Sequence, residues 1–185
     1  MMNKLNLELK QDKLAHSYFL LMEEITMATC KQAIEWTFDN NFSEERPEVL
    51  NLIICSPGGD LNAAFALIDT MRGSTIPVNT IGLGQIASAG LMIFIAGTKG
   101  HRILTPNTSI LSHQYTWGAF GKEHELFATV KEFDLTTKRL TAHYKRCTGM
   151  KEEQIRDVLL PAHDVWLDAQ EAKKYGLCDL VKDLK

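Results

Sequence analysis

The chain has 185 residues, of which 45% are hydrophobic and 23% are charged, and its formal net charge is -3. This length suits one domain that buries a sizeable core, and the ordinary globular composition excludes a disordered or fibrous chain. The small negative charge gives no reason to expect binding to nucleic acid or to an anionic membrane.

Cysteine usage and hydropathy indicate a cytoplasmic protein. The longest strongly apolar run, residues 91–96, is far shorter than the roughly 20 residues of a membrane-spanning helix. The first eight residues alternate polar and apolar side chains without an apolar core, so we expect no signal peptide. Reduced, mostly buried thiols are expected because the four cysteines are scattered and form no Cys-x-x-Cys motif: Cys30, Cys55, Cys147 and Cys178.

The first part of the chain alternates predicted strands and helices. Residues 17–22 predict a short buried strand, and Thr26 is placed to cap a helix that reaches Phe38. Residues 40–47 are polar and predict a surface loop. Residues 50–55 form a continuous apolar run, which is typical of a parallel strand buried on both faces.

Glycine and proline mark the end of that strand. The motif Ser-Pro-Gly-Gly at residues 56–59 breaks it, and Asp60 is placed to cap the next helix. A third strand near residues 78–82 leads to a turn at residues 84–88, with an apolar helix behind it. This βαβ alternation predicts an α/β fold with right-handed crossovers.

The second part of the chain predicts two short strands, a long helix and a short final helix. The strands, residues 102–104 and 109–111, flank a turn, and residues 118–121 predict a loop. The long helix ends at Gly149 and carries an apolar stripe that meets either the core or a neighbouring subunit: Leu126, Val130, Phe133, Leu140 and Tyr144. In the final helix, Asp168 is the predicted cap, Glu171 is its capping-box partner and Gly176 ends the helix.

Ser88 is the candidate nucleophile. It lies in Gly-Gln-Ile-Ala-Ser-Ala-Gly (residues 84–90), directly before an apolar run. The N–H groups and dipole of a helix starting there would point at its hydroxyl, which suits a reaction that develops negative charge on a nearby oxygen. The plain alternative is a serine that only caps a buried helix. The Gly-x-Ser-x-Gly elbow is absent because Ile86 stands two residues before Ser88, so an α/β-hydrolase is a poor fit.

A serine nucleophile needs a base, and His113 is the best placed of the six histidines. It follows a predicted strand, and the strand ends of α/β sheets gather functional groups. Spacing alone does not choose the carboxylate that would orient its imidazole. The other histidines are expected in loops or on polar helix faces: His16, His101, His124, His143 and His163.

Gly58 and Gly59 suit a backbone that comes close to a bound group and points an N–H at it. A plain tight turn is the alternative. Together with Ser88, the N–H groups of Gly59 and Ala89 could form an oxyanion hole with two donors.

Several motifs together resemble the proteolytic subunit of the Clp protease. The resemblance covers roughly residue 50 to the C-terminus, with a weaker match from Tyr18 onward. The matching motifs are Ser-Pro-Gly-Gly (56–59), Gly-Gln-Ile-Ala-Ser (84–88), Pro-Asn (106–107), Ser-His-Gln (112–114) and, in the tail, Asp164, Glu171-Ala172, Tyr175-Gly176-Leu177 and Asp179.

The resemblance implies roles for single residues. Ser88 matches the nucleophile, His113 the general base and Asp164 the carboxylate behind the histidine. Gly59 and Ala89 match the oxyanion donors, and Gly58 belongs to the same substrate-binding turn. No metal or other cofactor is implied.

The resemblance also implies a fold and an assembly. The fold is α/β, a spiral of βαβ units shared with the crotonases, with a projecting handle helix. We expect one domain over residues 1–185, with a head of roughly 17–113 and 150–185 and a handle of roughly 114–149. Two seven-membered rings would meet through the handles, and a hexameric AAA+ unfoldase would feed in unfolded protein. Residues 118–121 resemble the handle loop and strand that pair with substrate peptide. The implied activity is that of an ATP-dependent, cytoplasmic serine endopeptidase.

The chain departs from the family pattern in four places. Only about sixteen residues precede the first strand, which shortens the axial segment that touches the unfoldase. Tyr115 replaces the proline of His-Gln-Pro, which removes a rigid turn beside the base. Ala89 replaces a frequent methionine, which is tolerated because only its N–H is needed. Ala162-His163 replaces an acidic–Arg pair that contacts the opposite ring, which removes one contact of the double ring but leaves the other handle contacts to hold it.

Two other functions stay open. The first is a structural ring subunit with little activity that assembles with an active partner, which the altered N-terminus and ring contact favour. The second is an acyl-CoA enzyme of the crotonase type, which the Ser-His-Asp set disfavours. Signal peptide peptidases of related fold rank low because no lysine stands in a matching context.

Overall fold

The computed structural model describes residues 15–184. Strands and helices alternate along it, as the sequence predicts. The elements are β1 (His16–Leu21), α2 (Met27–Phe42), β2 (Val49–Ser56), α3 (Leu61–Gly73), β3 (Val78–Ala87), α4 (Ala89–Ile95), β4 (Arg102–Leu104), β5 (Ser109–Ser112), α5 (Glu123–Thr148), α6 (Glu152–Gln154), the π-helical turn η1 (Ile155–Leu159), β6 (Val165–Leu167), α7 (Ala169–Lys174) and β7 (Leu180–Val181).

Seven strands form one sheet. Its main path runs β1–β2–β3–β4–β7, and every neighbouring pair on this path is parallel. β3 serves two partners, because residues 80–82 pair with β4 and residues 85–87 pair with β5. β6 is antiparallel to β5. This mainly parallel sheet, with helices in the connections, confirms the predicted α/β fold.

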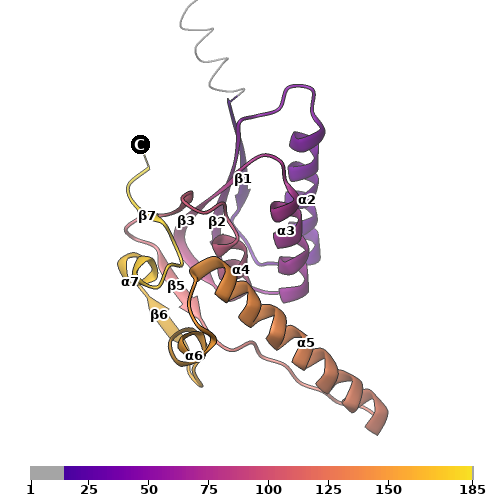
Figure 1. Cartoon of the computed structure of the whole chain (residues 1–185). Helices are drawn as coiled ribbons and strands as arrows, with labels where there is room; N and C mark the ends of the chain where they lie inside the picture. Colours follow the sequence, from indigo (N-terminus) through magenta and orange to yellow (C-terminus); the bar gives the residue numbers. More distant parts are fainter. Residues whose placement is uncertain (1–14, 185) are drawn as a thin grey trace, which may run out of the picture.

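The core lies between the sheet and its helices. Leu50, Leu52 and Ile54 of β2 are fully buried, which accounts for the apolar run in that strand. α2 and α3 lie side by side over the sheet (Figure 1). The Asp60 carboxylate accepts hydrogen bonds from two first-turn N–H groups of α3, which confirms the predicted cap. All seven residues of α4 are buried, so this helix is apolar on every side.

The prediction of a buried first strand is wrong for one face of β1. Tyr18 and Leu20 are 57% and 59% exposed, whereas Leu21 is fully buried. β1 is an edge strand of the main path, and α2 covers only one of its faces. On that covered face the ring of Phe19 lies 5.4 Å from the ring of Trp36.

The third strand is longer than predicted. We expected a turn at residues 84–88, but β3 continues to Ala87 because residues 85–87 pair with β5. Only Ser88 therefore separates β3 from α4. The sheet, rather than a flexible turn, positions this serine.

α5 projects from the body of the molecule, as the predicted handle helix would (Figure 1). The predicted apolar stripe divides along it: Leu140 and Tyr144 are buried, whereas Leu126 and Val130 are 38% and 54% exposed. The outer part of the stripe is thus largely uncovered within residues 15–184. The expected handle strand at residues 118–121 is wrong, since the structure has no strand there.

The prediction that His143 lies in a loop or on a polar helix face is wrong, because this residue of α5 is buried. Its Nδ1 accepts a hydrogen bond from Arg72 Nη2 at 2.6 Å, and its Nε2 donates to the Met92 carbonyl at 2.8 Å. A guanidinium only donates and a carbonyl only accepts, so the imidazole is neutral. Burial lowers the pKa of His143 to about 4. The bond to Met92 acts in the opposite direction, whereas the positive charges of Arg72 and Arg146 lower the pKa further.

We expect this histidine to make the protein less stable as the pH falls. Its pKa is 6.5 in the unfolded chain and about 4 in the fold. Between these values the unfolded chain takes up a proton that the native ring does not, so stability present above pH 6.5 is lost toward pH 4. The loss is about 3 kcal/mol.

The measurement is urea denaturation at pH 7 and pH 4. His143→Gln keeps one donor and one acceptor but does not titrate, so it should lose about 3 kcal/mol less than the wild type over this interval. Equal losses in the two proteins would contradict the assignment.

Some expectations concern the N-terminus. The absence of a signal peptide and the shortened axial segment involve residues 1–14, which lie outside the described residues. In the part of the chain that the structure describes, no helix is both long and apolar enough to cross a membrane. The four cysteines are free thiols, as expected.

Candidate active site

Ser88 is held in an unusual backbone conformation at the junction of β3 and α4. Its φ is 53° and its ψ is -120°, and it has the single positive φ of any non-glycine residue within residues 15–184. Such a conformation costs roughly 1–3 kcal/mol and persists only where the surroundings enforce it. Its side chain makes no capping hydrogen bond to α4. The alternative of a plain helix cap therefore lacks its defining contact.

Close backbone packing enforces this conformation. A Cβ on Gly58 would lie 2.7 Å from the Cβ of Ser88, and a Cβ on Gly90 would lie 3.1 Å from the Cβ of Ser56. The Ser88 N–H also donates to the Leu111 carbonyl of β5 at 3.0 Å. The small residues around Ser88 thus let the 56–59 turn, α4 and β5 converge on it.

Gly59 is locked to the segment that precedes α2. The Ile25 N–H donates to the Gly58 carbonyl at 2.8 Å, and the Asp60 N–H donates to the Ile25 carbonyl at 2.7 Å. The N–H of Gly59 itself takes no part in this bridge. Gly59 has a φ of 142°, and a Cβ there would collide with the Ile25 carbonyl. Ala89 is the first residue of α4, so its N–H has no acceptor within the helix.

The pairing of β3 with β5 brings His113 to the same place as Ser88. Ala87 lies opposite Leu111 in the parallel pair, so the residues after these strands meet at one edge of the sheet. Ser88 and His113 line one cavity of about 380 Å³, together with Gly59 and Ala89. The His113 Nε2 is buried and has no hydrogen-bond partner within residues 15–184. A buried nitrogen of this kind calls for a partner, which a substrate or the serine hydroxyl can provide.

Asp164 lies beside His113 but not in tight contact with it. β6 runs antiparallel to β5 with Ser112 opposite Val165, so the two residues that flank these strands are neighbours. His113 Nδ1 and Asp164 Oδ1 are 3.8 Å apart, and 63% of the Asp164 side chain is exposed. This separation exceeds hydrogen-bond length. The structure thus brings four predicted site residues into the lining of one cavity, and it places Asp164 beside His113 but outside that lining.

Hydrogen bonds on both sides of His113 hold its segment in place, and the sequence did not reveal them. Ser112 Oγ bonds Tyr144 Oη at 2.8 Å and donates to the Leu159 carbonyl at 2.5 Å. Gln114 Nε2 donates to the Leu160 carbonyl at 3.0 Å. Burial raises the pKa of Tyr144 well above its usual range despite the bond to Ser112, so its hydroxyl stays protonated. These bonds tie His113 to the end of η1, which leads to Asp164.

The cavity has an apolar wall beside the serine. Its remaining lining residues are Asp60, Leu61, Met92, Tyr115, Thr116, Leu140 and Tyr144. Tyr115, the residue that stands in place of a proline, packs against Phe133 of α5 and donates its hydroxyl to the Phe133 carbonyl at 3.0 Å. The wall can therefore accept an apolar side chain of a ligand bound next to Ser88.

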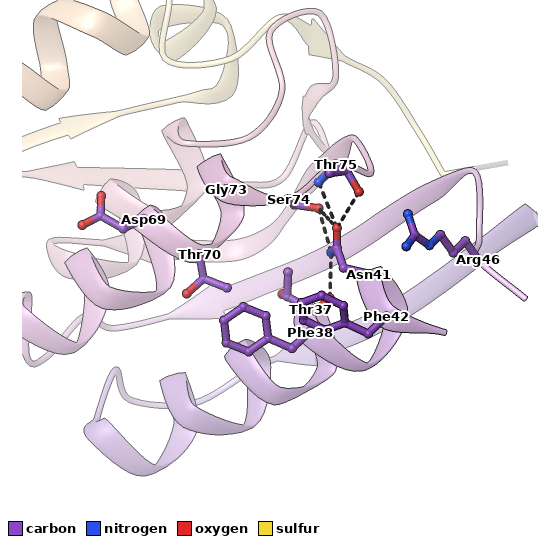
Figure 2. Close-up of a pocket in the computed structure, with 10 residues that line it drawn as sticks. All are labelled: Thr37, Phe38, Asn41, Phe42, Arg46, Asp69, Thr70, Gly73, Ser74 and Thr75. Atoms are coloured by element: carbon purple, nitrogen blue, oxygen red, sulfur yellow. Dashed lines mark hydrogen bonds between the residues drawn. The ribbon is translucent and has the colours of Figure 1, made fainter. Parts of the chain in front are cut away.

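A larger cavity, of about 410 Å³, lies elsewhere, between the ends of α2 and α3 (Figure 2). Asn41 dominates its polar lining. Its amide group bonds the Thr37 carbonyl, the Ser74 hydroxyl and both the N–H and the hydroxyl of Thr75. These bonds satisfy polar groups of the turn after α3, so Asn41 has a structural role there. The residues that line this cavity include no nucleophile–base pair.

Comparisons with known proteins place the chain in a family. The sequence model of the Clp protease family matches residues 10–185. The chain is 33% identical over 159 residues to the ATP-dependent Clp protease proteolytic subunit 2 of Corynebacterium glutamicum. That alignment covers 86% of this chain and 76% of the relative.

Proposed function

The chain belongs to the Clp protease family, and from this premise we propose that it is a serine endopeptidase whose triad is Ser88, His113 and Asp164. The observation that carries the proposal is the meeting of two unusual features in one cavity. Ser88 is a strained serine at a helix start, and His113 presents a buried Nε2 without a partner. Strain and unsatisfied polar groups concentrate at functional sites.

The mechanism follows from the positions of these groups. His113 Nε2 takes the proton of the Ser88 hydroxyl as the oxygen attacks a peptide carbonyl. The negative charge that develops on the carbonyl oxygen is stabilised by the N–H groups of Gly59 and Ala89, each worth roughly 10²–10³ in rate. His113 then gives its proton to the leaving amine. Water hydrolyses the acyl-enzyme with the same imidazole acting as base.

Asp164 completes the proposed triad by accepting a hydrogen bond from His113 Nδ1–H, which selects the tautomer with a free Nε2. Their present separation is 3.8 Å, so the carboxylate has to approach by about 1 Å to form that bond. Its exposed side chain is free to do so. Catalytic hydrogen bonds are often long in the absence of substrate and tighten in the complex.

We propose further that the chain assembles into heptameric rings, paired through α5, and works with an AAA+ unfoldase in the cytoplasm. The outer part of α5 supports this assembly. Besides Leu126 and Val130, its Phe127 and Leu135 are 69% and 49% exposed, so apolar side chains lie on more than one side of this part of the helix. An apolar surface of this kind marks a contact with another chain. Rings enclosing the site would admit unfolded polypeptides and exclude folded proteins.

The test of the nucleophile is covalent labelling. A fluorophosphonate probe should label the wild-type protein on Ser88, and Ser88→Ala should lose the label and roughly 10⁴-fold or more of fluorogenic-peptide turnover. Ser109→Ala is the matched control, because it removes a hydroxyl from neighbouring β5 whose one bond, to Gly84, is 3.4 Å long. Equal labelling of the wild type and Ser88→Ala would contradict the assignment of Ser88 as the nucleophile.

A structural ring subunit with little activity is the second candidate. The 3.8 Å gap between His113 and Asp164 favours it, because an aligned triad needs a shorter contact. The same peptide assay decides between the two candidates. A purified wild-type protein that turns over peptide no faster than Ser88→Ala would be a structural subunit.

A further inference from the structure

A basic cavity of about 270 Å³ lies between α3 and α5, apart from the candidate active site. Each helix contributes residues that are four and then three positions apart, so they form one stripe. The lining residues are Phe65, Asp69 and Arg72 of α3 and Arg139, Ala142, His143 and Arg146 of α5. Three arginines thus face a cavity that has one carboxylate in its lining.

Neutral groups hold two of the guanidinium groups in place. Arg72 Nη2 donates to the neutral ring of His143 at 2.6 Å. Arg139 Nη2 donates to Asn62 Oδ1 at 3.1 Å and to Thr136 Oγ1 at 2.7 Å, and its guanidinium lies 5.0 Å from the centre of the Phe65 ring. These contacts fix the orientation of both groups and bring no negative charge to them.

The carboxylates nearby do not neutralise this charge at hydrogen-bond distance. Asp69 Oδ1 is 3.9 Å from Arg72 Nη1, and 79% of its side chain is exposed. Glu132 Oε1 is 3.5 Å from Arg139 Nη2 and is also largely exposed. Within residues 15–184, Arg146 forms no ion pair. Exposed pairs at these distances contribute little.

The buried histidine anchors the cavity to the interior. His143 is 3% exposed and donates to the Met92 carbonyl of α4, so Arg72 is fixed to the core through one imidazole. A preorganised donor loses less entropy when it binds a ligand than a mobile surface side chain does. Met92 also lines the cavity next to Ser88, so this residue of α4 connects His143 of the basic cavity to the candidate active site.

We propose that this cavity binds a multiply charged phosphate anion, of which inorganic pyrophosphate is the probe. Guanidinium groups match phosphate oxygens in pairs of parallel hydrogen bonds. Three of them around one small cavity suit a ligand with several negative charges better than a single carboxylate. The proposal does not depend on the peptidase activity, because binding is measured without peptide.

The test is calorimetric titration of the whole protein with pyrophosphate at about 0.15 M salt, which screens nonspecific attraction. Arg146→Gln removes a lining arginine that makes no hydrogen bond or ion pair within the described residues, and it should weaken binding about tenfold or more. Lys145→Gln is the matched control, since it removes the same charge one position away, outside the cavity lining. It should weaken binding less than about twofold.

Melting temperatures within about 2 °C of the wild type would show that both variants fold. Two results would overturn the proposal. One is a wild-type protein that shows no saturable binding up to about 10 mM pyrophosphate. The other is a loss of affinity that is the same in Arg146→Gln and Lys145→Gln, which would indicate attraction to the overall charge and not a site.

Discussion

Replacing His113 with alanine is expected to lower kcat/KM for a fluorogenic peptide by roughly 10⁴-fold or more, with little change in stability. Without the imidazole, Ser88 loses the base that we propose for its hydroxyl proton, and it becomes a poor nucleophile. The fold should survive, because the His113 Nε2 makes no hydrogen bond within residues 15–184 that the substitution would remove. Steady-state kinetics on the purified wild-type and variant proteins measures this change in kcat/KM.

His101→Ala is the matched control for this variant. His101 is exposed in the loop before β4, and within residues 15–184 its one hydrogen bond is made by its backbone N–H, to the Thr98 carbonyl. It should retain full activity. If His113→Ala kept more than about a tenth of the wild-type kcat/KM, the role of general base would have to pass to another group.

The second large effect is expected for Gly59→Ala, which should lower kcat/KM at least about 100-fold. A methyl group at Gly59 collides with the Ile25 carbonyl, and the φ of 142° is one that side chains rarely adopt. Relief of the collision moves the 58–60 backbone away from Ile25, which takes the proposed oxyanion donor out of position. The bridge to Ile25 breaks with it, so the melting temperature should also fall.

Gly73→Ala is the matched control, because a methyl group there meets no atom within 4 Å and Gly73 has no positive φ. It should leave kcat/KM unchanged and raise stability slightly, as glycine-to-alanine changes in helices do. A Gly59→Ala protein with wild-type turnover would show that this N–H does not serve the reaction. Thermal unfolding measured alongside the kinetics separates lost chemistry from lost fold.

Local sequence patterns predicted the helices and strands, whereas the pairing of distant strands decided where β3 ends and which face of β1 is exposed. Asp60 and Asp168 cap helices in the structure because capping depends on residues within one turn. The length of β3 was underestimated, because its last residues become a strand only through β5, more than twenty residues away. β1 was expected to be buried because its composition is apolar, but its place at the sheet edge exposes Tyr18 and Leu20.

The candidate site follows the same division. Ser88, Gly58 and Gly59 stand in short motifs whose chemistry can be read from neighbouring residues. His113 was found from its place after a strand, and Asp164 came only from the family resemblance, since no spacing selects it. Tyr144 and His143 remained hidden because a helix stripe does not show which polar groups will be buried. Their partners, Ser112 and Arg72, come from distant parts of the chain.

The attachment of β5 has a consequence for cooperativity. β5 and β6 join the sheet through the three residue pairs that link β5 to β3, and within residues 15–184 β6 pairs only with β5. Gly59 belongs instead to the turn after β2, which hydrogen bonds tie to Ile25. Sub-global opening of the short β5–β6 ladder would therefore remove His113 and Asp164 together and release the Ser88 N–H from the Leu111 carbonyl, while the bridge between Ile25 and the 58–60 backbone stays formed. All three members of the proposed triad thus depend on the local stability of one short ladder.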